Sequence, residues 1–317
     1  MDSCRPRSAA ALALVLLAAG CSAAGTSPLG SSQGPPLSLA RAHGRPIPDA
    51  QRKYVYVADN YASTVWIFPA GKANPNPTGS ITTGIVGPQG LAVDGSGNLY
   101  VANTGGGTVT VYPAGGSSPS LTLSQDLTDP TAVAVDSKGD VWVSNEEGGY
   151  QGSLVEFPAG QTTPSTVINN LNPLGIAVDS ADNLYAESYN SSTAYVAIYP
   201  PGASQPSQTF GQKDLLEPLG ITVGRTGDVY VGDYYYDDVF IFAAKTHKLR
   251  HKVFVEAGDL VGLTISRDKR LYVADADMAV VSEISRRGFG KVLADRLHNN
   301  LSSAFGVAAD PAVAPGP

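Results

Sequence analysis

Apolar and polar residues follow a repeating pattern along most of this chain. A short apolar segment that ends in a polar residue, Tyr-Val-Ala-Asp in its first copy, recurs six times. Its aromatic residues are separated by 44, 42, 43, 45 and 42 positions. A repeat of this length predicts one small structural unit used many times over. The six copies are residues 56–59, 100–103, 142–145, 185–188, 230–233 and 272–275.

Each repeat contains four strand-like segments. In the second repeat these are residues 90–94, 99–103, 108–112 and 120–123. The turn at 94–98 is rich in Asp, Gly, Ser and Asn, which predicts a hairpin. The second segment is apolar on both faces, as in sheets that stack on one another. We therefore expect the repeated aromatic residues to pack between neighbouring sheets.

Two further features of the pattern predict how the sheets end and close. The third segment ends in Pro-Ala-Gly at 69–71, 113–115 and 158–160, and in Pro-Pro-Gly at 200–202, where proline stops a strand and sets a turn. The chain enters the domain at a second strand, 54–59, and leaves it at a first strand, 306–310. The last strand can thus complete the first sheet and remove a free edge. The predicted fold is an all-β, six-bladed β-propeller of four-stranded antiparallel blades, the first closed by the C-terminal strand.

The motif in each repeat has a known counterpart. Pro-x-Gly-[Leu/Ile]-[Ala/Thr]-Val-Asp followed by Gly-Asn-Leu-Tyr-Val-Ala-[Asp/Asn] resembles NHL-repeat propellers and the wider regucalcin and gluconolactonase-like group. The resemblance covers residues 54–310 and implies the same six-bladed fold. The Gly-His and Trp-Asp signatures of WD40 propellers do not appear in the repeat.

The N-terminal segment predicts export. Arg5 and Arg7 precede an apolar run at 9–19 that is too short to span a bilayer. The run ends in Leu-Ala-Ala-Gly-Cys, which resembles the bacterial lipobox and implies lipidation of Cys21; ordinary secretory cleavage near residues 23–24 is the alternative. We assign 1–20 to a lipoprotein signal peptide, 21–50 to a lipidated flexible tether, 51–311 to the propeller and 312–317 to a disordered tail.

This assignment predicts the compartment and the covalent state. The mature protein is expected in a bacterial cell envelope, held at the membrane by its lipid anchor alone. Ser22 is not Asp, so by resemblance to Gram-negative lipoproteins the outer membrane is favoured if the host has one. Because Cys4 leaves with the signal peptide, no internal disulfide is possible. A monomer is expected.

The resemblance also implies where a catalytic metal would bind. The metal-dependent lactonases of the group hold a divalent cation mostly with acidic or amide side chains just before the first-strand glycine. Four of the six equivalent residues here are apolar and none is a carboxylate, so we assign no metal-binding or catalytic residue and expect no cofactor, with calcium left open. The six positions are Gln89, Thr131, Leu174, Leu219, Val261 and Phe305.

Histidine-dependent chemistry, as in propeller lyases, has few candidates. His247, His251 and His298 are the histidines of the domain, and the first two fall in a basic outer segment at 245–252. Positive charge there discourages edge pairing. No nucleophile-elbow, phosphate-loop or HExxH motif appears.

A ring of polar and aromatic residues is the candidate ligand site. First-strand starts and second-strand ends share one face of a propeller, and amide or carboxylate groups beside tyrosine rings suit sugar or peptide recognition. The competing explanation is that Asp and Asn at strand ends bond the backbone of the following turn. The candidates are Asp59, Tyr61, Asn103, Asn145, Glu146, Tyr150, Ser188, Tyr189, Asp233, Tyr234, Tyr235, Asp237 and Asp275. The cluster at 234–238 is the least generic part.

Charge is unevenly spread along the repeats. Residues 53–244 contain 18 acidic and 5 basic side chains, whereas residues 245–296 contain 7 acidic and 11 basic ones. The basic sector predicts either contact with an anionic partner or a solvated rim. Nucleic acid is not an expected partner of an exported acidic protein.

These observations favour a binding or scaffolding lipoprotein that recognises a glycan, a peptide or an envelope protein on its polar face. The alternative is a metal-dependent lactonase, another hydrolase, or a lyase of the gluconolactonase-like type. The fold cannot decide between them, because propellers support both. Catalysis is the less favoured option.

Overall fold

The computed structural model describes residues 54–72, 74–147, 152–190, 193–255, 258–266, 269–284 and 295–310. The chain divides into a unit of residues 1–41 and a unit of residues 42–317, and every described element belongs to the second. The predicted signal peptide, Cys21, the tether at 21–50 and the tail at 312–317 lie outside the described residues.

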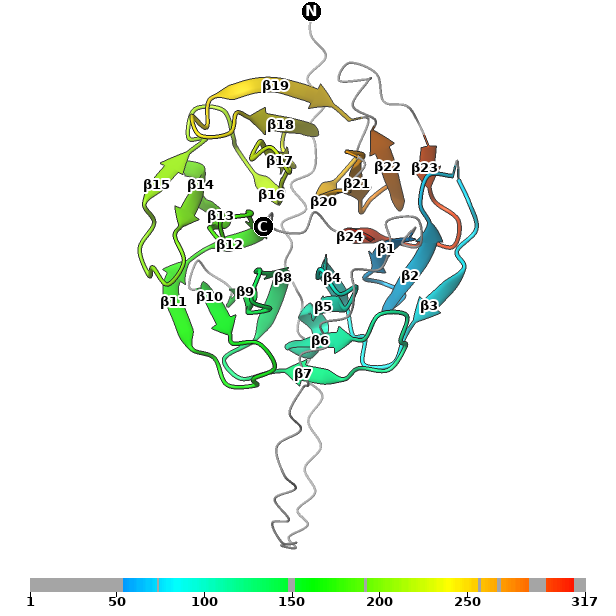
Figure 1. Cartoon of the computed structure of the whole chain (residues 1–317). Helices are drawn as coiled ribbons and strands as arrows, with labels where there is room; N and C mark the ends of the chain where they lie inside the picture. Colours follow the sequence, from blue (N-terminus) through cyan, green and yellow to red (C-terminus); the bar gives the residue numbers. More distant parts are fainter. Residues whose placement is uncertain are drawn as a thin grey trace, which may run out of the picture. The chain divides into compact units, whose positions relative to one another are not determined.

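The described residues form six four-stranded antiparallel sheets arranged as blades around a central axis (Figure 1). They contain no α-helix, and their one helical element is a 3-10 turn, η2 (Thr104–Gly106). The predicted all-β, six-bladed propeller is therefore confirmed.

Each blade runs from an innermost strand at the axis to an outermost strand at the rim. Blade one is β24 (Ala304–Asp310), β1 (Tyr54–Asp59), β2 (Thr64–Pro69) and β3 (Gly79–Ile81). Blade two is β4 (Pro88–Val93), β5 (Leu99–Asn103), β6 (Thr108–Tyr112) and β7 (Leu121–Leu123). Blade three is β8 (Asp129–Val135), β9 (Val141–Glu146), β10 (Gly152–Phe157) and β11 (Thr166–Leu171).

The other three blades have the same order. Blade four is β12 (Pro173–Val178), β13 (Leu184–Asn190), β14 (Thr193–Tyr199) and β15 (Gln208–Phe210). Blade five is β16 (Pro218–Val223), β17 (Val229–Asp233), β18 (Asp238–Phe242) and β19 (Leu249–Phe254). Blade six is β20 (Leu260–Ile265), β21 (Leu271–Asp275), β22 (Val280–Ile284) and β23 (Asp295–Leu297).

The first blade is closed by the last strand, as predicted. Strand β24 pairs antiparallel with β1, with Tyr54 opposite Asp310 and Val57 opposite Val307. Asp59 strengthens this closure, because its Oδ1 accepts a hydrogen bond from the Ser302 hydroxyl at 2.6 Å. The two ends of the domain are thus joined by main-chain bonds within one sheet and by a side-chain bond beside it, which gives β1 a hydrogen-bonded neighbour on its inner side.

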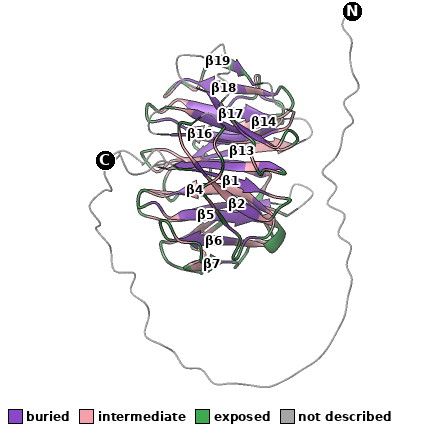
Figure 2. Ribbon diagram, turned by 90° about the vertical axis from the view of Figure 1, so that its right-hand side faces the viewer, coloured by how far each residue is buried: buried purple, intermediate pink, exposed green. Residues whose placement is uncertain are grey.

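The hydrophobic core is divided among the six interfaces between neighbouring blades. Each interface has one buried cluster, and each cluster contains one repeated aromatic residue: Tyr56, Tyr100, Trp142, Tyr185, Tyr230 or Tyr272. Figure 2 shows the buried strands running through the disc, with exposed residues along its loops. Because second strands such as β5 are buried at every position, their apolar character on both faces is explained by a blade on each side.

In blades two, three and four the turn after the first strand is held by its aspartate, Asp94, Asp136 or Asp179. Asp94 accepts hydrogen bonds from the backbone N–H groups of Ser96 and Asn98, from the Asn98 side chain and from the Tyr100 hydroxyl. Asp179 makes the equivalent bonds, including one from the Tyr185 hydroxyl. Burial and the neighbouring carboxylate raise the pKa of both tyrosines. The predicted hairpin turn is confirmed, and the side-chain network explains the Asp of these three copies; Gly224 and Ser266 take its place in blades five and six.

The Pro-Ala-Gly turns have the backbone geometry that the sequence predicts. Gly71, Gly115, Gly160 and Gly202 have φ values of 69, 74, 72 and 74°, in the left-handed region that favours glycine. Proline therefore ends each third strand and glycine completes the turn.

Candidate functional site

In each blade the end of the second strand lies beside the start of the first, as predicted. Pro88 is opposite Asn103, Pro173 is opposite Ser188, and Pro218 is opposite Asp233. The face that carries these ends is termed the upper face. It consists of the connections that follow each second strand and those that lead into each first strand; the other connections form the lower face.

Most of the predicted polar ring is buried beneath the upper face. Five of its six members are 0 to 2% exposed, so they are not on the surface where a ligand would contact them first. These five residues are Asp59, Asn103, Asn145, Asp233 and Asp275.

Asp233 shows what the buried members do. Its Oδ2 accepts hydrogen bonds from the backbone N–H groups of Leu216, at 2.7 Å, and Glu217, at 3.2 Å. Its Oδ1 accepts from the N–H groups of Tyr235 and Tyr236. One carboxylate therefore joins the loop that enters blade five to the loop that follows its second strand.

The other members repeat this arrangement. Asn145 Oδ1 accepts from Thr128 N at 2.7 Å, and Asp275 Oδ2 accepts from Gly258 N at 2.7 Å. In each case this partner lies in the loop that leads into the first strand of the same blade. Strand-end Asp and Asn residues thus satisfy loop backbone groups that would otherwise lack partners. Equivalent bonds join Asn103 to Val86 and Asp59 to Ser302.

Blade four departs from the pattern. Its ring residue Ser188 is half-buried, and the preceding residue, Glu187, is fully buried where the other blades have Ala58, Ala102, Ser144, Gly232 and Ala274. Neither carboxyl oxygen of Glu187 has a hydrogen-bond partner of normal geometry. Burial raises the pKa of Glu187 well above its ordinary value, and nearby Asp233 raises it further, although the N–H groups of Gly175 and Gly220 act in the opposite direction.

The loop at 234–238 places its tyrosines in different environments. Tyr234 is half-buried and donates a hydrogen bond to Asp259, and burial followed by this carboxylate raises the pKa of Tyr234 to about 12. Tyr235 and Tyr236 are 56 and 42% exposed and contact each other edge to face at 5.2 Å. Lys252 lies 5.1 Å from the centre of the Tyr236 ring. This loop therefore presents two aromatic rings to solvent.

Other exposed apolar side chains lie on the same face. Tyr61 is 77% exposed, Val86 49%, Leu216 41% and Met278 44%. They lie in the connections that follow the second strands of blades one and six and lead into blades two and five. With Tyr235 and Tyr236 they form an arc over blades five, six, one and two.

The remaining candidates are dispersed around the face. Tyr189 donates a hydrogen bond to Glu217 at 3.2 Å, so it joins blade four to the loop entering blade five. Asp237 is buried, with a φ of 54°. Glu146 is half-buried, and burial followed by Asp129 raises its pKa. Tyr150 lies outside the described residues.

The sequence did not identify Leu216, Met278 or Val86 as surface residues. Apolar residues in a repeat are normally assigned to its core, and only their position in loops, outside the four strands, distinguished them. An alignment of the six second strands could have identified Glu187, because the residues at the equivalent position in the other five strands are all small.

The positions implied for a lactonase metal are half-buried at the starts of the inner strands. Thr131 is already bonded there to Ser144 and to the carbonyl oxygen of Leu174. Among the described residues, no group of three or more His, Cys, Asp or Glu side chains is placed to hold a metal ion. His247 lies on the lower face, stacked on Phe210 at 4.6 Å, and burial lowers its pKa.

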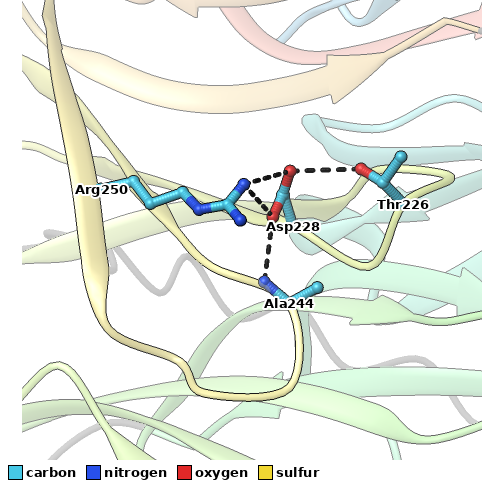
Figure 3. A network of polar contacts seen from close by, with 4 residues as sticks. All are labelled: Thr226, Asp228, Ala244 and Arg250. Carbon is cyan, nitrogen blue, oxygen red and sulfur yellow. Dashed lines mark hydrogen bonds and ion pairs between the residues drawn. The ribbon is translucent and has the colours of Figure 1, made fainter.

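Part of the basic sector is internally paired. Arg250 of strand β19 contacts Asp228 at 3.0 Å, and the same carboxylate accepts hydrogen bonds from Thr226 and from Ala244 N (Figure 3). Arg270 pairs with Glu283. These two arginines stabilise the lower-face ends of blades five and six rather than standing alone as unpaired charges.

Comparison with known proteins gives structural neighbours only. No protein-family model matches the chain, and no curated protein matches it. The domain is similar to a chain in a crystal structure of a nidogen/laminin complex, with a TM-score of 0.68 and 17% identity over 80% of this chain and 97% of the other.

Two further solved structures share the arrangement. A protein of unknown function from Bacteroides caccae has a TM-score of 0.63 and 11% identity over 81% of this chain and 98% of its own. Kuenenia stuttgartiensis hydrazine synthase has a TM-score of 0.54 and 14% identity, covering 74% and 92%. At these identities the likeness establishes the β-propeller fold alone.

The described residues contain no helix that is both long and apolar enough to cross a bilayer.

Proposed function

We propose that this protein is a binding module of the bacterial cell envelope whose upper face docks a protein or peptide partner. The observation that carries the proposal is the distribution of exposed large apolar side chains. Of nine such residues in the described chain, six lie in upper-face loops: Tyr61, Val86, Leu216, Tyr235, Tyr236 and Met278. Apolar side chains gathered on one face of a soluble domain mark interaction surfaces.

The mixture of side chains favours protein over glycan. Sugar recognition uses aromatic rings together with polar groups that fix hydroxyls, but the ring carboxylates and amides of Asp233 and its equivalents already bond loop backbone. Aliphatic Leu216 and Met278 beside tyrosines are typical of protein interfaces, in which aromatic residues and methionine are enriched. That one structural neighbour was solved as a nidogen/laminin complex agrees with a role in protein association.

The envelope location is part of the same proposal. The lipobox-like segment before Cys21 and the tether at 21–50 would hold the monomeric propeller at a membrane, the outer one in a Gram-negative host. In the native bacterium, Cys21→Ser should move the protein from the membrane fraction to the soluble fraction, because the lipid anchor is lost. An unchanged membrane fraction would exclude Cys21 as the anchor.

Photo-crosslinking tests the binding face. Benzoylphenylalanine replaces Tyr235 on the upper face, and in a matched variant it replaces Ser117, an exposed residue of a lower-face turn. Irradiation of intact cells should give one or a few discrete, higher-mass protein adducts from position 235 and none from position 117. Adducts of equal intensity from both positions, or from position 117 alone, would contradict the proposal.

A further inference from the structure

The two faces of the propeller differ in charge. Among the described residues of the upper-face connections, Lys213 is the one lysine or arginine. The exposed or half-buried acidic residues of the same connections are Asp126, Glu147, Asp214, Glu217, Asp259 and Asp277. Strand residues add Asp129, Glu146 and Asp238 at this face, and Lys252 of β19, which lies over the Tyr236 ring, as a further cation. The lower-face connections, by contrast, mix both signs. Their basic residues include Lys72, Lys138, Arg225, Lys245, Lys248 and Lys269.

Acidic residues lie directly beside the exposed apolar ones in the chain. Leu216 is followed by half-buried Glu217, and exposed Asp277 precedes Met278. The same short loops therefore offer apolar area and negative charge together. Such an arrangement is complementary to a surface in which aliphatic or aromatic groups alternate with cations.

The aromatic part of this surface already holds a cation from its own chain. Lys252 Nζ lies 4.3 Å from the centre of the Phe240 ring and 5.1 Å from that of Tyr236. An ammonium or guanidinium group over an aromatic face is attracted by the ring quadrupole. Tyr235 contacts Tyr236 and is 56% exposed. Its ring is therefore available to a cation of a partner, beside the ring that Lys252 already covers.

The pKa values of two upper-face residues also reflect the negative charge of this face. Burial, followed by the carboxylates of Asp259, Glu217 and Asp237, raises the pKa of Tyr234, and burial followed by Asp129 raises that of Glu146. Negative charge thus exceeds positive charge locally on this face, so an approaching cation would be favoured.

We infer that the partner docks on the upper face over blades five and six through a cationic segment in which Lys or Arg alternates with apolar residues. This inference rests on the proposed function and specifies the chemistry of its partner. The apolar groups of the segment cover Leu216, Tyr235, Tyr236 and Met278, while its cations meet Glu217, Asp259 and Asp277. Lower-face residues take no part.

A peptide array tests the inference with a defined probe. The full chain, purified in mild detergent, is applied to short immobilised peptides in which net charge and apolar content vary independently, and in which arginine is replaced by neutral citrulline in matched copies. Binding should require both cationic and apolar residues, and citrulline should abolish most of it. The double variant Glu217→Gln with Asp277→Asn should weaken binding to the cationic peptides about fivefold.

A charge-matched control separates local contact from net charge. Gln161→Lys with Ser117→Lys adds the same positive charge at exposed lower-face turns, and it should leave binding within about twofold of wild type. Equal binding of acidic or neutral peptides, equal loss in both double variants, or no binding to any peptide would overturn the inference. If the peptide array gives one of these results but the crosslink at position 235 persists, the proposed docking function stands and only its cationic partner is excluded. If the crosslink at position 235 is also absent, the docking function itself is excluded.

Discussion

Single residues divide into those that hold the upper face together and those that are presented on it. Asp59, Asn103 and Asp233 are buried and bond loop backbone, whereas Tyr61, Tyr235 and Tyr236 are exposed. The sequence identified all of these residues except Tyr236 as candidate ligand-binding residues. It could not separate the buried residues from the exposed ones. Each buried residue has a hydrogen-bond partner in a second loop that is distant in the sequence, as with Ser302 and Asp59, which are 243 positions apart.

Glu187 is the residue whose titration should affect stability most. An unfolded glutamate titrates near pH 4.3. Burial holds the folded-state pKa well above this value. Above about pH 4 the folded protein therefore keeps a proton that the unfolded chain releases, so the free energy of unfolding falls as pH rises until it reaches the folded-state pKa.

Glu187→Gln should remove this loss. Urea unfolding at several pH values between about pH 5 and pH 8 should show wild type losing stability relative to the variant, by up to about tenfold in the unfolding equilibrium constant per pH unit. Glu147→Gln, at an exposed glutamate of the same face, is the matched control and should follow wild type. Parallel profiles for wild type and Glu187→Gln would show that the buried carboxyl does not titrate as described.

At the level of strands and turns, the sequence predicted the four-stranded repeat and the two kinds of turn within it. The strands expected in the second repeat agree closely with β4, β5, β6 and β7, because Asp-rich and Pro-Ala-Gly turns mark their ends. What it did not predict is how closely the inner strands approach one another. At Gly220 a Cβ atom would lie 3.2 Å from the Cα of Gly262 in the next blade. The repeated glycine of the first strand thus serves packing around the axis.

Gly262→Ala should therefore be costly. A methyl group there would overlap the carbonyl oxygen of Phe305, a backbone atom that cannot move without shifting β24. We expect a loss of about 1–3 kcal/mol in the free energy of unfolding, measured by urea denaturation. Gly95→Ala is the control, since a Cβ at Gly95 meets nothing within 4 Å. Similar stability of the two variants would contradict this close packing of the inner strands.

For the whole molecule, the sequence predicts the fold but not the functional surface. The six-bladed ring follows from the period and from the first-strand copy at the C-terminal end of the repeats, since closure depends on the number of units and where they start. The functional surface does not follow in this way. The exposure of Leu216, Met278 and Val86, and the near absence of basic residues from the described upper-face loops, depend on how loops from separate repeats lie on one face.

Docking of partners on the upper face can be tested by a crosslinking scan over both faces. Benzoylphenylalanine is placed singly at Tyr61, Val86, Leu216, Tyr235 and Met278, and at Lys72, Ser117, Lys138 and Gln161 on the lower face. Docking on the upper face predicts adducts of the same protein partner from several of the upper positions, concentrated at Leu216, Tyr235 and Met278, and none from the lower set. Adducts confined to the lower positions, or spread evenly over both faces, would contradict it.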